Sequence, residues 1–154
     1  MESAITQQML ERVPNDQFSY KPHEKSMTLQ QMTTHFAELP GWIAMGFASS
    51  ELDFANTPYE MTSINNRDEL LELFKKAVEA GKTSLEKASE EDLLPSWTLR
   101  HGETIFMTFT RYELSRHSFA QTIHHRAQLG VFLRKPFHYP RPTDQVPMNP
   151  AFDC

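Results

Sequence analysis

The sequence RHSFAQTIHHRAQL, at Arg116–Leu129, is predicted to form the core-facing part of a long helix. Side chains four residues apart lie above one another on a helix, so His117, Gln121 and His125 form one row. Imidazole nitrogens and an amide oxygen can all bind a metal ion. His117 and His125 are separated by roughly 12 Å along the axis and cannot share one ion, whereas Gln121 can share it with either. Because two ligands from one helix do not close a site, another segment must supply a third.

The composition favours one all-α domain spanning residues 1–154, because the chain has only five glycines and several helix-type apolar patterns. The single cysteine, Cys154, excludes an intrachain disulfide, so we expect a reducing, cytoplasmic location. A net charge of −5 without a Lys/Arg cluster argues against nucleic-acid and anionic-membrane partners. The sequence also lacks an apolar run of about 18 residues and the pattern of a signal peptide.

Two helices are predicted in the first third of the chain. Residues 3–13 carry apolar side chains at helical spacing, and Pro14 ends this short helix. A second helix should begin at about Thr28, which forms a capping box with Gln31. Its apolar stripe comprises Leu29, Met32, His35, Phe36 and Leu39. This pattern places a histidine on the face that the helix buries.

Pro40-Gly41 should kink or break the second helix, because proline lacks an N–H for the helical hydrogen bond. The apolar segment after it predicts that the helix resumes to about Ala48. Residues 49–65 show no sustained periodicity and are interpreted as a long loop. Asn66 then caps a third helix that extends to about residue 88.

The final third of the chain is predicted to hold the longest helix. Residues 96–107, with Gly102 as the turn residue, fit a small β-hairpin, although Phe106 to Tyr112 could instead begin the last helix. This fourth helix should run from about Thr110 to Arg134 and end before Pro136. Five of the ten prolines lie in the last 20 residues, so residues 135–154 are predicted to be a non-helical tail.

His35 is the candidate for the missing ligand. In a domain of four helices, its face and the Gln121/His125 face can both point into the bundle. Three protein ligands with an open position are typical of a catalytic metal ion. A hydrogen-bonded core role for His35 stays open, because a lone histidine on an apolar face is more often structural. His124 is offset from His125 by about 100° around the helix.

Three stretches of the sequence resemble the DinB/YfiT superfamily. They are KPHEKSMTL at residues 21–29, THFAELPGW at residues 34–42, and IHHRAQL at residues 123–129 followed by FLR at 132–134. The isolated histidine of the second stretch and the His-His-Arg-x-Gln-Leu run of the third are the most specific features. The resemblance covers about residues 9–134.

This resemblance implies a four-helix bundle with up-down-down-up connectivity, often a homodimer, holding a divalent metal, usually nickel or zinc, with three histidines. Two of the three match His35 and His125. The third position, four residues before His125, is Gln121. Either Gln121 binds the ion through its amide oxygen, or the site is weak and often empty. His117, His124 and Arg126 are candidates for an alternative ligand or for residues that support the ligands by hydrogen bonds.

The resemblance also implies a function. Characterised relatives are metal-dependent transferases or isomerases that use a low-molecular-weight thiol, so the first hypothesis is a thiol transferase acting on a small molecule. The ion would lower the pKa of the thiol and present the thiolate to an electrophile. A second hypothesis is a non-catalytic, stress-associated dimeric module with a degenerate site. A metal-dependent hydrolase is a third, which would need a general base that the sequence does not identify.

Overall fold

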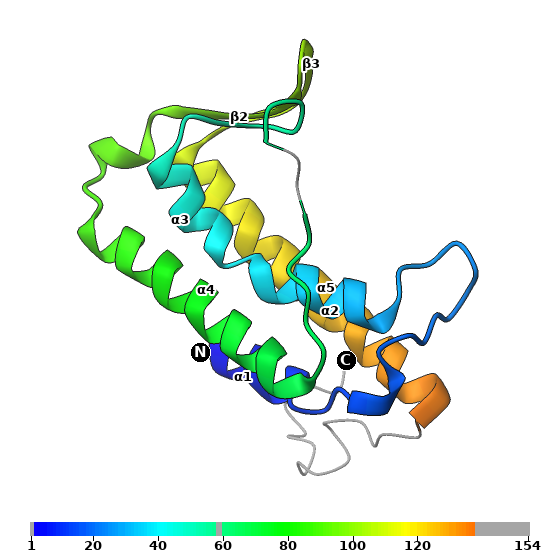
Figure 1. The fold of residues 1–154 in the computed structure, drawn as a ribbon. Coiled ribbons are helices and arrows are strands. Elements are labelled where there is room, and N and C mark those ends of the chain that lie inside the picture. The colour runs from blue at the N-terminus through cyan, green and yellow to red at the C-terminus, as the bar shows by residue number, and fades with distance from the viewer. Residues whose placement is uncertain (1, 58–59, 138–154) are drawn as a thin grey trace, which may run out of the picture.

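A computed structural model describes residues 2–57 and 60–137 of the chain. The described part is mostly helical, with a small sheet at one end (Figure 1). Its α-helices are α1 (Glu2–Leu10), α2 (Leu29–Glu38), α3 (Gly41–Ala48), α4 (Arg67–Lys87) and α5 (Arg111–Phe137). Its strands are β1 (Glu51–Asp53), β2 (Ser96–His101) and β3 (Thr104–Thr110). Short 3₁₀ turns occupy Asn15–Gln17 and Glu91–Leu93.

The capping and breaking signals in the first half of the sequence act where they were predicted. Thr28 accepts a hydrogen bond from the Gln31 N–H at 3.0 Å, and Gln31 Oε1 accepts one from the Thr28 N–H at 2.9 Å. This reciprocal capping box starts α2 at Leu29. Pro40 separates α2 from α3, so the two helices form one interrupted rod.

The rods are connected up-down-down-up, as predicted. The α2–α3 rod runs parallel to α4. Gly41 lies beside Ala77, and Ile43, further along the rod, lies beside Gly81, one turn further along α4. The same rod is antiparallel to α5. Gly46, late in the rod, lies against Leu114 near the start of α5, whereas Leu39, earlier in the rod, accepts a hydrogen bond from Ser118, further along α5. Helix α1 packs on both α4 and α5. No described helix combines the length and apolar character needed to span a bilayer.

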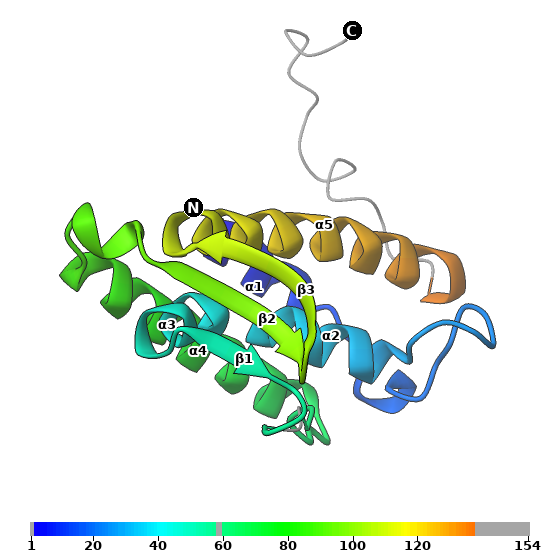
Figure 2. The same ribbon diagram turned by 90° about the horizontal axis from the view of Figure 1, so that it is seen from above.

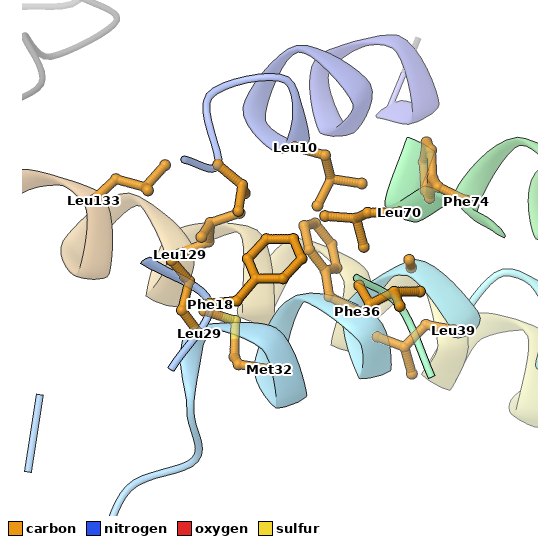
Figure 3. Close-up of a cluster of buried hydrophobic side chains, with 13 residues drawn as sticks. Leu10, Phe18, Leu29, Met32, Phe36, Leu39, Leu70, Phe74, Leu129 and Leu133 are labelled. Atoms are coloured by element: carbon orange, nitrogen blue, oxygen red, sulfur yellow. The ribbon is translucent and has the colours of Figure 1, made fainter. Parts of the chain in front are cut away.

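The larger hydrophobic core fills the centre of the bundle (Figure 3). Phe36 of α2 is fully buried there, among side chains from α1, α4 and α5. These neighbours include Leu10, Leu70, Leu129 and Leu133. A second cluster forms around Trp97, Leu99 and Leu114, where the sheet meets α5. Burial of these apolar surfaces is what fixes α2 against α5.

The predicted hairpin is confirmed, and it belongs to a three-stranded sheet in the order β1-β2-β3. Strands β2 and β3 are antiparallel and turn at Gly102, whose φ of +56° suits glycine. Strand β1 pairs in parallel with β2 (Figure 2). The prediction of a loop throughout residues 49–65 was therefore wrong at β1. A three-residue strand has too few positions for a periodic signal, and its partner is distant in sequence.

The predicted end of the last helix was also wrong. Helix α5 runs from Arg111 to Phe137 and thus continues past Pro136, so residues 135–137 are not part of a non-helical tail. A proline in the last turn removes one hydrogen bond near an end where several carbonyls lack helical partners anyway. The rest of the predicted tail, residues 138–154, lies outside the described residues.

Candidate functional site

The structure brings His35 of α2 and His125 of α5 into direct contact. Their ring centroids lie 5.0 Å apart with an interplanar angle of 86°. Both side chains are partly buried. The contact arises because α2 and α5 pack antiparallel through apolar stripes on which each histidine takes one position. The pair predicted from helical spacing therefore lies together between two rods.

The surroundings of the pair favour neutral imidazoles. Burial lowers the pKa of His35, and the neighbouring His125 lowers it further, whereas Glu38 raises it. Burial also lowers the pKa of His125, while a hydrogen bond with Gln128 raises it and His124 lowers it. An unperturbed histidine has a pKa near 6.5, so a pKa lowered from there favours the neutral ring at pH 7. A neutral imidazole has an unprotonated nitrogen that can bind a metal ion.

Gln128 fixes the orientation of the His125 ring. Its Oε1 atom lies 2.8 Å from His125 Nδ1, and an amide oxygen can only accept a hydrogen bond. Nδ1 therefore carries the proton, and Nε2 is left as the free acceptor. This is the kind of outer hydrogen bond that orients histidine ligands in metal sites.

Gln121 and His117 precede His125 along the same helix face, in the row predicted from the sequence. Gln121 is partly buried one turn before His125. His117, one further turn away, stacks against Phe109 of β3 with ring centroids 5.1 Å apart and a tilt of 30°. This contact gives His117 a packing role beside the sheet.

The other two supporting candidates differ in their contacts. The ring of His124 lies 5.3 Å from that of His125, centroid to centroid, but is exposed. The Arg126 guanidinium forms an ion pair with Glu2 at 2.7 Å and a hydrogen bond with Thr6 Oγ1 at 3.3 Å. Arg126 therefore ties α1 to α5.

Two neighbours of His35 complete the surroundings. The Trp42 ring lies 6.3 Å from the His35 ring at 82°, and it was not singled out from the sequence. Its spacing could have identified it, because residues seven apart share a helix face. Glu38 Oε1 accepts hydrogen bonds from the Thr62 N–H at 3.2 Å and from Thr62 Oγ1 at 2.5 Å. This contact brings the loop after β1 close to α2.

The separation of the two imidazole rings is the one expected for two ligands of a single metal ion. Rings bound to a tetrahedral ion at a metal–nitrogen distance of about 2.0–2.1 Å have centroids about 5 Å apart, as His35 and His125 do. Residues 2–57 and 60–137 contain no group of three or more His, Cys, Asp or Glu side chains able to hold a metal ion. A third protein ligand from α5 would therefore be the amide of Gln121, a weaker donor for zinc or nickel.

Comparisons with known proteins agree with the fold. The model of the DinB family matches residues 1–149. A search of curated proteins finds no match.

Three solved structures are similar to this chain. A DinB-like protein of Bacillus subtilis is 23% identical, with a TM-score of 0.68, over 92% of this chain and 90% of that one. A DinB-like protein of Bacillus cereus is 18% identical, with a TM-score of 0.62, over 86% and 84%. A mycothiol-dependent maleylpyruvate isomerase is 17% identical, with a TM-score of 0.57, over 84% of this chain and 56% of the isomerase. At these identities the likeness establishes the shared fold.

Proposed function

The chain belongs to the DinB family, and from that premise we propose that its bundle holds a divalent cation between α2 and α5. His35 and His125 would bind it through imidazole nitrogens, and Gln121 through its amide oxygen. The observation that carries this proposal is the contact of the two imidazole rings, whose centroids lie 5.0 Å apart. Imidazole ligands suit nickel and zinc.

The proposed activity uses a small thiol and a small electrophilic substrate. The thiol is either transferred to the substrate or acts on it as a catalyst. A divalent cation at this position would bind the sulfur and favour its thiolate at neutral pH. The isomerase with the same fold is mycothiol-dependent, which motivates a thiol as co-substrate. The only cysteine of the chain is Cys154, which suits an attack carried by a bound thiol.

The protein's own residues would orient and shield the reactants. Gln128 holds His125 with Nε2 free, and the Trp42 ring lies beside His35, where it would limit access of water. Glu38 lies close enough to raise the pKa of His35 and is anchored by Thr62. A carboxylate near the imidazoles offers a proton acceptor for an incoming thiol.

One observation favours a second candidate, a helical module whose metal site has lost its function. Gln121 stands where the resemblance implies a histidine, and the described residues lack a group of three conventional ligands. With two imidazoles and an amide, affinity for a divalent cation is lower than with three imidazoles. The homodimer implied by the resemblance stays a prediction under either function.

Metal content tests the proposal. Tag-free protein is purified without chelator, incubated with nickel or zinc, desalted and analysed for metal per chain, alongside His35→Ala and His101→Ala. His101 is an exposed histidine of β2 and serves as the matched control. We expect close to one ion per chain in wild type and His101→Ala, and little in His35→Ala.

Two outcomes would contradict the proposal. Wild-type protein that retains no metal would favour the module with a lost site, and equal metal in His35→Ala would place the ion elsewhere. If the expected pattern appears, thiol transfer to small electrophiles is assayed with the same three proteins. Loss of activity only in His35→Ala would connect the site to the reaction.

A further inference from the structure

A cavity lies between α4 and α5, beside the N-terminus of α1. Helix α1 begins at Glu2 and packs against both α4 and α5. Beside its first turn, the space between these two helices holds a hollow of about 470 Å³. We call it the α4–α5 hollow, and its principal lining residues are Pro40, Ile43, Phe74, Val78, Leu85 and Phe119. None of the residues lining it is His35, Gln121 or His125.

The floor of the hollow is sheltered and apolar. Ile43 and Phe74 line it, yet each is only 3% exposed. Gly81 also lines it, and a Cβ atom there would come within 2.5 Å of the Pro40 carbonyl oxygen, so α3 and α4 are in close contact beneath the cavity. Phe119 is 48% exposed and lies on its α5 side. An apolar molecule that enters the hollow would cover the part of the Phe119 side chain that otherwise contacts water.

Most of the polar side chains around the hollow already have partners. Ser118 Oγ donates to the Leu39 carbonyl oxygen at 2.6 Å, and Thr122 Oγ1 donates to the Ser118 carbonyl oxygen at 2.9 Å. The charged side chains are also paired: Lys82 with Glu86 at 3.7 Å, and Glu2 with Arg126 at 2.7 Å. A charged ligand would therefore have to compete with these existing ion pairs, so the hollow favours an uncharged ligand over a charged one.

We propose that the α4–α5 hollow binds an uncharged, mainly apolar small molecule, at a site separate from the histidine pair. Its volume lies within the range of about 300–1,000 Å³ found for small-molecule sites. A helix of a second copy is a poorer fit, because the nearly inaccessible Ile43 and Phe74 are beyond the reach of a helix laid across the surface. The volume of the hollow and the existing partners of its polar side chains together favour a small, uncharged and mainly apolar ligand.

The test uses N-phenyl-1-naphthylamine, an uncharged probe whose fluorescence rises in apolar surroundings. Val78→Phe and Leu85→Phe each place extra volume at a lining residue, and Val131→Phe is a matched control on α5 outside the lining. We expect saturable binding to wild type, about tenfold or more weaker binding in both lining variants, and wild-type binding in the control. Circular dichroism and thermal melting show which variants are folded, and His35→Ala should bind the probe like wild type.

Several outcomes would overturn the proposal. These are non-saturable binding to wild type, equal affinity in a folded lining variant and wild type, or loss of binding in the Val131→Phe control. Light scattering over a dilution series completes the test, since probe binding that appears only as a dimer dissociates would assign the hollow to a second copy. Probe binding that disappears in His35→Ala would instead place the probe at the histidine pair.

Discussion

The hydrogen bond from His125 Nδ1 to Gln128 Oε1 determines which imidazole nitrogen faces a ligand. Without it, the ring can rotate and exchange tautomers before it binds an ion. We predict that Gln128→Ala lowers zinc affinity by about tenfold or more, in the range found for outer hydrogen bonds of metal-bound histidines. Gln128→Glu should restore most of the affinity, because its carboxylate also accepts from Nδ1–H.

Isothermal titration of metal-free protein with zinc measures these affinities. Gln7→Ala is the control, since this exposed glutamine of α1 donates a hydrogen bond to Glu11, just after the helix. If Gln128→Ala binds zinc as tightly as wild type, the hydrogen bond does not orient the ligand.

Single residues of the candidate site were predictable to the extent that helical spacing determines position. His35 and His125 each share a face with core side chains, so their meeting followed from bundle packing. The proton position on His125 was not predictable, because it depends on a rotamer of Gln128. Nor did spacing alone separate His117 from a ligand role, since its stacking on Phe109 requires the hairpin to fold back onto α5.

At the scale of elements, Asp53 joins β1 to the turn of the hairpin. Its Oδ1 accepts hydrogen bonds from the Gly102 and Ala55 N–H groups, both at 2.9 Å, and Arg100 lies 3.4 Å from its Oδ2. The two backbone hydrogen bonds are the main reason that the pKa of Asp53 lies below its ordinary value, with Arg100 and Asn56 adding to the effect. The folded protein thus favours ionised Asp53.

This lowered pKa predicts a pH dependence of stability. Ionised Asp53 stabilises the folded protein fully above the unfolded-state pKa of about 3.9. This stabilisation is lost as the pH falls through the lower pKa of Asp53 in the folded state. Asp53→Asn should therefore melt at a lower temperature than wild type at pH 7 and lose less stability on acidification to pH 3. Melting curves across this range provide the measurement, with the exposed Asp16→Asn as control. Parallel curves for wild type and Asp53→Asn would contradict the assigned role.

Elements with local signals were predicted well, and those that depend on distant partners were not. Asn66 caps α4 through its Oδ1 and the Glu69 N–H at 2.9 Å, as the sequence indicated. Strand β1 exists because Glu51–Asp53 pair with residues 98–100, far along the chain. Pro136 was given too much weight as a helix terminator, because its effect is small in the last turn.

At the scale of the whole molecule, a metal ion at the histidine pair would link two rods that are distant in sequence. His35 lies on the α2–α3 rod and His125 on α5, so unfolding would separate the ligands. A ligand that binds only the folded state stabilises it by about 2.7 kcal/mol at a free concentration of 100 times Kd. For a chain of this size that corresponds to a rise in Tm of about 5–10 °C.

We therefore predict that zinc raises the Tm of chelator-treated wild-type protein, with a smaller rise in His35→Ala. His101→Ala should respond like wild type, since its exposed imidazole lies on the hairpin. The measurement is thermal melting by circular dichroism over a zinc series that brackets the Kd from titration. An equal rise in wild type and His35→Ala would mean that zinc stabilises the fold from another position, so the histidine pair would not be the bridge between the rods.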